Sequence, residues 1–420
     1  MKFSEYVITE RAGILVDPLG FLKPSRALQD TIFRQFTVLT NRPGYHGFLC
    51  LVWKLLEDSG HPVGSPNFSR KFRESEIFWG LLNAAQGTPV LNINKYKTLL
   101  DEPLSLKSIR SGDAIYARLA YGTLGHYSQP SITWGLIEPN GRALNARGTA
   151  LAKAASLRGK LDFARWLARW NAGEKFTWEA VADIQQAFHL QATPSQQEQG
   201  VWRELISRWT QLYPQASALW SDPFAHHELD EADQSAEAHC AFHQDLPVRY
   251  SGLKSEMNAL TRFERLSGAV QFIFDLKLST LEFESSPLIT QLGLLDELAP
   301  AIVQLALDNA RCSGVQPARL FATLAATSAR YAPLEEAIIL HHCVHQRAKG
   351  VSPFLEGSHL LVKGKVEKKE MGDLLEDLAK CENVKAQLDR LQYRSRRDWH
   401  FRRCRAYYDW ADGSVQGATR

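Results

Sequence analysis

The sequence predicts a mainly helical protein with several domains and one small β-hairpin. Along most of the chain, apolar residues recur at the three- and four-residue spacing of amphipathic helices. The 420 residues exceed the usual size of one domain and indicate two or three domains. Because 45% of the residues are hydrophobic, the chain can build sizeable cores, and its composition is not that of a disordered protein.

The first helices are predicted near the start of the chain. Ser25 can cap a helix that runs toward Phe36. A second helix is predicted from Tyr45 onward by the spacing of Phe48, Leu49, Leu51, Val52, Leu55 and Leu56. After a loop at residues 60–66, a third is predicted by Phe68, Phe72, Ile77, Phe78, Leu81 and Leu82.

The hairpin is predicted within residues 105–155. A predicted helix over 105–122 leads through a glycine-containing turn into the run 131–137, which is followed by the turn Glu138-Pro-Asn-Gly and the short run 142–144. Another helix is predicted from Thr149. This order is typical of a winged helix, in which the hairpin is the wing. A hairpin that only packs on helices would give the same pattern, so both interpretations remain open.

The rest of the chain continues the helical pattern. Tryptophans four or seven residues apart predict a core-facing stripe, and they are Trp166, Trp170, Trp202 and Trp209. The polar, proline-containing residues 191–200 are the best candidate for a linker. We therefore expect a helical domain over 1–190 with the winged-helix-like region at about 105–155, a helical middle domain over 201–330, and a helical C-terminal region over 331–420 with a basic end.

Composition also bears on the cellular location. No apolar stretch approaches the roughly 20 residues of a membrane span, and the N-terminus lacks the pattern of a signal peptide. The six cysteines include no C-x-x-C pair, which favours reduced thiols over a disulfide framework. We therefore expect a cytoplasmic protein with no membrane partner.

Two groups of histidines have the spacing of metal ligands. His239 and His243 stand four residues apart, so on a helix both imidazoles would share a face and could bind zinc. They follow His226 and His227, and Cys240 stands where a metalloprotease helix has its glutamate. The alternative is a solvated acidic loop with surface histidines.

The second group is His341 and His345, again four residues apart and preceded by apolar residues. His400 and Cys404 repeat the spacing, so the four could form a structural zinc site. The alternative is a half-buried helix whose histidines bond to carboxylates.

The most basic stretch of the chain lies near its C-terminus. Aromatic residues alternate there with six arginines: Arg394, Arg396, Arg397, Arg402, Arg403 and Arg405. Arginine pairs with phosphate oxygens, and rings such as those of Trp399, Tyr407 and Tyr408 can stack on bases. The stretch is thus the best candidate for a nucleic-acid contact. Alternatively, its arginines pair with an acidic surface, such as the acidic segment 228–245.

The sequence lacks the common short motifs of catalysis. The sequence has no phosphate-binding G-x-x-x-x-G-K-[ST] loop, no G-x-S-x-G elbow and no dinucleotide fingerprint after a strand. The nearest approach to a nuclease site is Asp275 with Lys277 and Glu282 with Glu284, in an apolar run that is better explained as core. The sequence therefore favours a non-catalytic protein and predicts no cofactor.

Three short segments carry a family resemblance, namely Thr37–Trp53, Phe72–Leu81 and Tyr121–Gly148, with a weaker echo in His341–Phe354. They resemble poorly characterised accessory proteins encoded in bacterial phage-defence islands beside helicases, ATPases or nucleases. The resemblance implies an intracellular accessory role in defence against phage, and it supplies no catalytic residue.

Together these observations predict a non-catalytic, DNA-associated accessory subunit of a bacterial anti-phage defence complex. Its expected partners are double-stranded DNA, held by the six arginines and Trp399, and the other subunits of the complex. Two alternatives stay open. One is a metal-dependent hydrolase or nuclease that uses the histidine groups, and the other is a purely structural helical adaptor.

Overall fold

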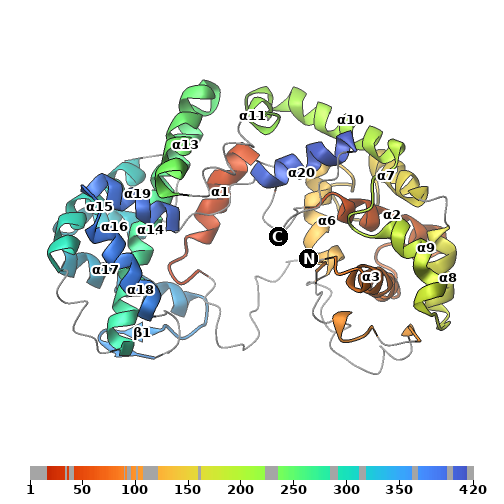
Figure 1. Cartoon of the computed structure of the whole chain (residues 1–420), viewed down its shortest axis with the longest axis horizontal. Coiled ribbons are helices and arrows are strands. Elements are labelled where there is room, and N and C mark those ends of the chain that lie inside the picture. Colours follow the sequence, from red (N-terminus) through yellow and green to blue (C-terminus); the bar gives the residue numbers. More distant parts are fainter. Residues whose placement is uncertain are drawn as a thin grey trace. The chain divides into compact units, whose positions relative to one another are not determined.

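The computed structural model confirms a mainly helical chain. It describes residues 17–33, 36, 42–88, 90–91, 96–100, 103–106, 122–158, 162–222, 235–283, 292–311, 318–361, 368–394 and 401–413. The chain divides into two compact units (Figure 1). The first contains Met1–Arg34 and Asp222–Trp399, and the second contains Gln35–Ser221 and His400–Arg420.

This division differs from the three regions that the sequence suggests. The chain passes between the units at residues 34–35, 221–222 and 399–400, so each unit is built from segments distant in sequence. The candidate linker 191–200 lies inside the second unit, where Ser195 caps a helix. Polar composition indicated a linker there because a helix cap and a linker use the same residue types.

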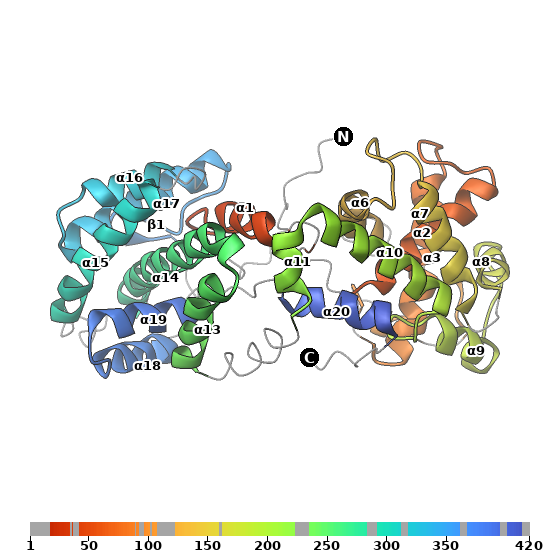
Figure 2. The same cartoon turned by 90° about the horizontal axis from the view of Figure 1, so that it is seen from above.

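In the first unit, one long helix lies among the others (Figure 2). This central helix, α14, packs against α1, α13, α15, α17, α18 and α19. Among the described residues of the unit, the helices are α1 (Leu22–Phe33), α13 (Ala236–Arg249), the 3-10 turn η3 (Ser251–Leu253), α14 (Lys254–Phe283), α15 (Leu292–Arg311), α16 (Ala318–Ala326), α17 (Tyr331–Ala348), α18 (Lys368–Ala379) and α19 (Val384–Arg394). A hairpin of β1 (Leu355–Glu356) and β2 (His359–Leu360) completes it, with Leu355 opposite Leu360.

Helix α14 explains the apolar run that contains Asp275 and Lys277. Phe274, Leu276 and Leu278 are buried, which agrees with the interpretation of this run as core. The Lys277 ammonium lies 2.6 Å from a carboxylate oxygen of Glu335 on α17. The run thus serves to pack α14 against its neighbours.

Helix α1 corrects one detail of the sequence analysis. It begins at Leu22, so Ser25 lies inside the helix and does not cap it. Ser25 is buried, and its hydroxyl accepts a hydrogen bond of 3.2 Å from the Gln29 side chain one turn later. The Asp17 carboxylate instead accepts a bond from the backbone N–H of Phe21, just before the helix.

The second unit is built around α2, which packs against α3, α6 and α7. Its described helices are α2 (Gly44–Asp58), α3 (Phe68–Ala85), α6 (Thr123–Trp134), α7 (Ala146–Ser156), α8 (Phe163–Asn171), α9 (Trp178–Phe188), α10 (Gln196–Leu212), α11 (Pro214–Trp220) and α20 (Phe401–Asp412). The helices predicted from Tyr45 and from Phe68 are confirmed as α2 and α3. The predicted tryptophan core is confirmed for Trp170 and Trp202, which are fully buried, whereas Trp166 and Trp209 are only half-buried.

The predicted hairpin connects α6 to α7. The first part of the run 131–137 is helical, because α6 ends only at Trp134, and Gly135 with φ of 72° stops it. Antiparallel pairing is limited to one bridge between Ile137 and Leu144. The side chain of Asn145 then caps α7, which begins at Ala146 and not at Thr149. The helix expected over 105–122 falls mainly outside the described residues, and the winged-helix identity stays a prediction.

Gly148 lets this hairpin lie against the start of α7. A Cβ atom at Gly148 would stand 2.0 Å from the carbonyl oxygen of Leu136, a backbone atom that cannot move alone. We expect Gly148→Ala to destabilise the second unit by about 3 kcal/mol. Ten of the eleven tryptophans belong to this unit, so tryptophan fluorescence during urea unfolding measures the effect there.

Gly200→Ala is the matched control for that substitution. Gly200 lies in α10, and a Cβ atom there would meet nothing within 4 Å. Alanine should stabilise the helix by about 0.5–1 kcal/mol, because it restricts the unfolded chain. Equal effects of the two alanines would contradict the close approach at Gly148.

None of the helices in the described part of the chain is both long enough and apolar enough to span a membrane.

Candidate functional site

The predicted arginine cluster begins at the last residue of α19 and ends in the second turn of α20. Arg396, Arg397 and Trp399 lie outside the described residues, as do the side chains of Arg394, Arg402 and Arg403. Arg405 is described. Its side chain is 36% exposed, and its Nε lies 3.6 Å from a carboxylate oxygen of Asp409 one turn later.

Helix α20 is fixed to the second unit by its apolar face. Cys404, Tyr407, Trp410 and Ala411 are buried, and the helix packs against α10 and α11 (Figure 1). The Arg203 guanidinium donates a 3.0 Å hydrogen bond to the carbonyl oxygen of Ala411 near the end of the helix. The expectation that Tyr407 could stack on a base is therefore wrong, because its ring belongs to the core.

The first histidine pair is also buried. His239 and His243 lie on α13 with ring centroids 4.2 Å apart, and the ring of Tyr393 on α19 lies 5.5 Å from that of His239. Burial, with the nearby His239 and Arg265, holds the pKa of His243 well below its usual value. The alternative of surface histidines is thus wrong for these two, since the helix packs them inward. His226 and His227 lie outside the described residues.

The second histidine group contacts the segment that precedes α1. The ring of His341 on α17 lies 3.0 Å from the carbonyl oxygen of Leu19, and the ring of His345 covers Gly20. Between them, His342 accepts a 2.9 Å bond from the backbone N–H of Phe354 and donates one of 2.9 Å to the carbonyl oxygen of Pro18. Burial lowers the pKa of His342 to about 4.

This arrangement agrees with the half-buried helix expected for the second group, although the histidines contact backbone carbonyls and not carboxylates. Cys404 belongs to the other unit, and His400 lies outside the described residues. Across the described ranges, no group of three or more His, Cys, Asp or Glu side chains is arranged to hold a metal ion.

The structure reveals a polar centre in the second unit that sequence reasoning missed. His46 on α2 is fully buried, and both of its ring nitrogens have hydroxyl partners. Nδ1 lies 2.7 Å from Oγ of Ser131 on α6, and Nε2 lies 2.8 Å from the phenol oxygen of Tyr407 on α20. One imidazole thereby joins three helices whose residues are 85 and 361 positions away in the sequence.

Aromatic rings enclose this centre. The His46 ring lies edge-on to Tyr127 at 5.1 Å and to Trp202 at 5.6 Å, and Tyr407 stacks on Trp134 at 5.0 Å. Burial lowers the pKa of His46 to about 3, so the imidazole is neutral at ordinary pH. A serine beside a histidine is the contact of a hydrolytic nucleophile. Here both side chains are sealed from solvent, and Tyr407 holds the second nitrogen, so the contact stabilises the core.

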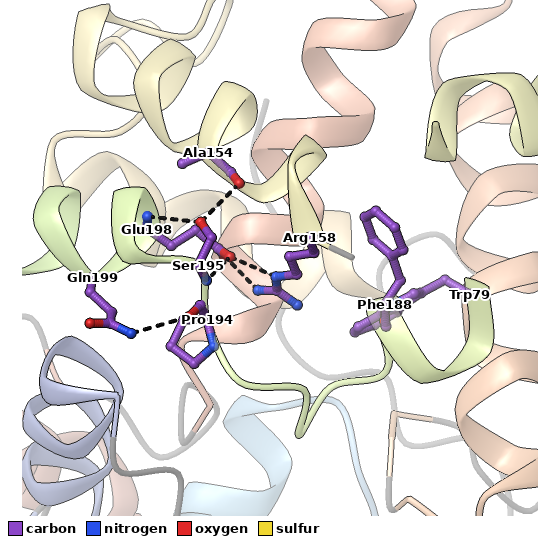
Figure 3. Close-up of polar contacts among 8 residues, drawn as sticks. All are labelled: Trp79, Ala154, Arg158, Phe188, Pro194, Ser195, Glu198 and Gln199. Carbon is purple, nitrogen blue, oxygen red and sulfur yellow. Dashed lines mark hydrogen bonds and ion pairs between the residues drawn. The ribbon is translucent and has the colours of Figure 1, made fainter. Parts of the chain in front are cut away.

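A buried ion pair lies beside Gly47, the residue after His46. Figure 3 shows its polar contacts. Arg158, just after α7, donates through Nε and Nη2 to both carboxylate oxygens of Glu198 at 2.7 and 2.6 Å. Glu198 also accepts the backbone N–H of Ser195 at 3.0 Å, and the Ser195 hydroxyl accepts the backbone N–H of Glu198 at 3.1 Å. These reciprocal bonds form a capping box at the start of α10.

Part of this arrangement has a sequence signal and part has none. Ser-x-x-Glu at 195–198 is the spacing of a capping box and could have been recognised. The buried face of α20 is signalled by Cys404, Tyr407 and Ala411 at helical spacing. No local pattern in the sequence around His46 predicts that Ser131 and Tyr407 are its hydrogen-bond partners.

Comparison of the chain with protein-family models, with curated proteins and with solved structures found no match.

Proposed function

We propose that this chain is a non-catalytic, DNA-associated accessory subunit of a bacterial anti-phage defence complex. One observation carries the DNA contact: the stretch from Arg394 to Arg405 holds six arginines and one aspartate in a chain of net charge +3. Such a local excess of positive charge attracts the phosphate backbone and releases its counterions.

The anchoring of α20 supports this assignment. Its buried face and the hydrogen bond from Arg203 hold the helix in place, so the backbone that carries these arginines is fixed. Because Tyr407 and Trp410 are buried, we assign the helix to phosphate contact and not to base stacking. Phosphate contacts position a protein on the duplex without reading its sequence.

The defence role rests on the resemblance of Thr37–Trp53, Phe72–Leu81 and Tyr121–Gly148 to accessory proteins of phage-defence islands. Of these segments, the second lies within α3, whose residues from Phe72 to Ala84 are all buried. The resemblance therefore includes core positions, and it supports a shared architecture more directly than a shared surface.

The DNA contact is tested by fluorescence anisotropy of a labelled duplex across a salt series. We expect wild-type protein to lose about a thousandfold in affinity between 50 and 200 mM salt, as for about six phosphate contacts. Changing the six arginines to alanine should reduce the slope of log K against log salt by about five.

A variant with the same six arginines changed to lysine is the control, since it keeps the charge and should keep most of the slope. Tryptophan fluorescence during urea unfolding checks that α20 remains docked in each variant. If wild-type protein does not bind DNA at low salt, or if the alanine variant keeps the wild-type slope, the proposal is wrong.

A helical adaptor is the second candidate, and one observation favours it. Leu340 and Val344 stand one turn apart on α17 with exposures of 62% and 53%. Neighbouring exposed apolar side chains are typical of a protein-binding surface. If the chain ignores DNA and Leu340→Ser with Val344→Ser abolishes binding to another subunit, the adaptor is the correct function.

A further inference from the structure

A cavity of about 380 Å³ lies in the second unit between α2, α3 and α8. Its size falls within the usual range of small-molecule sites. Buried Val52 and Leu56 from α2 and Leu167 from α8 supply apolar walls. Helix α3 packs against both α2 and α8, so the cavity is formed before any ligand arrives.

Two basic side chains reach the same cavity. Lys71 on α3 and His61, in the loop before α3, both line it and are half-buried. No carboxylate lies within ion-pair distance of Lys71 among the residues that the structure describes, although its neighbours Arg70 and Arg73 each pair with a glutamate. None of the described lining residues is acidic. The polar rim is therefore suited to an anion.

A third polar residue, Asn171 at the end of α8, also lines the cavity. Its Oδ1 has almost no surface open to solvent, so a ligand in the cavity does not reach that atom.

From these groups we infer that the cavity binds a small organic anion with an apolar body. The anionic group lies at Lys71 and His61, and the apolar body rests on Val52, Leu56 and Leu167. This site is independent of the proposed DNA contact, which uses other residues.

Indole-3-acetate is a probe that carries both features, and isothermal titration of the full chain measures its binding. We expect wild-type protein to bind it at millimolar concentration or below. Lys71→Met should weaken binding about tenfold, since it removes a charge-assisted bond.

Two further variants distinguish binding in the cavity from binding elsewhere on the protein surface. Ala168 lines the cavity and is exposed, so Ala168→Phe should block binding without disturbing the core, whereas Ala180→Phe on the exposed side of α9 should not. Lys153→Met on α7 is the charge control for Lys71. Absence of binding to wild-type protein overturns the inference, as does equal binding by the Ala168 and Ala180 variants or by the Lys71 and Lys153 variants.

Discussion

Replacing Glu198 by alanine is expected to destabilise the second unit by about 3–5 kcal/mol. The side chain of Glu198 is fully buried and that of Arg158 is 6% exposed, so alanine would leave the guanidinium charged and without its partner. The same change removes the capping box that begins α10. It also removes a neighbour of α2, because Oε1 of Glu198 would lie 3.2 Å from a Cβ at Gly47.

The measurement is urea unfolding followed by tryptophan fluorescence, with Glu204→Ala as the matched control. Glu204 lies on the same helix and pairs with Arg147 at 2.8 Å, but the two side chains are 60% and 37% exposed. An exposed pair contributes at most about 1 kcal/mol. Comparable losses from the two substitutions would show that the Arg158–Glu198 pair does not behave as a buried one.

The double variant Arg158→Met with Glu198→Leu tests why Glu198→Ala loses stability. If the loss in Glu198→Ala comes from an unpaired buried charge, removal of both charges should restore most of the stability. The remaining deficit should reflect the lost helix cap, which is about 1 kcal/mol. A double variant as unstable as Glu198→Ala would assign the loss to packing.

The second large effect is a loss of stability in acid that depends on His46. Burial lowers the pKa of His46 to about 3 in the folded protein, whereas an exposed histidine has a pKa near 6.5. Between these values the unfolded chain binds a proton that the folded unit does not. The free energy of unfolding therefore falls as the pH drops below about 6.5, by about 4 to 5 kcal/mol at pH 3.

His46→Gln isolates this contribution. Glutamine can bond to the hydroxyls of Ser131 and Tyr407 but does not titrate. We expect the variant to be less stable than wild type at pH 7 but to have a shallower dependence of unfolding free energy on pH between 6 and 4. Other groups of the unit, such as His126 and His189, titrate in both proteins and cancel. Parallel pH profiles for the two proteins would refute the assignment to His46.

Local patterns in the sequence determined much of the fold. Helical spacing of apolar residues located α2 and α3, and the spacing of the tryptophans identified Trp170 and Trp202 as core residues. These predictions succeed because a helix places residues three and four apart on one face, so the pattern needs no information from elsewhere in the chain. The turn between α6 and α7 was recognised for the same reason, since its glycine and asparagine act on their immediate neighbours.

Local patterns were less reliable where two structures use the same residues. Ser25 has the chemistry of a helix cap but lies inside α1, and the polar residues before α10 form a cap and not a linker. Tyr407 stands beside the arginines as in a nucleic-acid contact, yet its ring is buried. In each case the residue type fitted both structures, and the place of the residue in the folded unit decided its role.

What the sequence alone determined is therefore the helical class, the first helices of the second unit and the concentration of arginines near the C-terminus. Only the tertiary structure decided which segments form each unit, which hydroxyls bond to His46, and that Arg158 pairs with Glu198. It also decided that Lys71, His61 and Asn171 line one cavity. The physical reason is distance along the chain: periodicity encodes how one helix buries its face, but a buried polar group is matched to partners that the packing of distant helices brings to it.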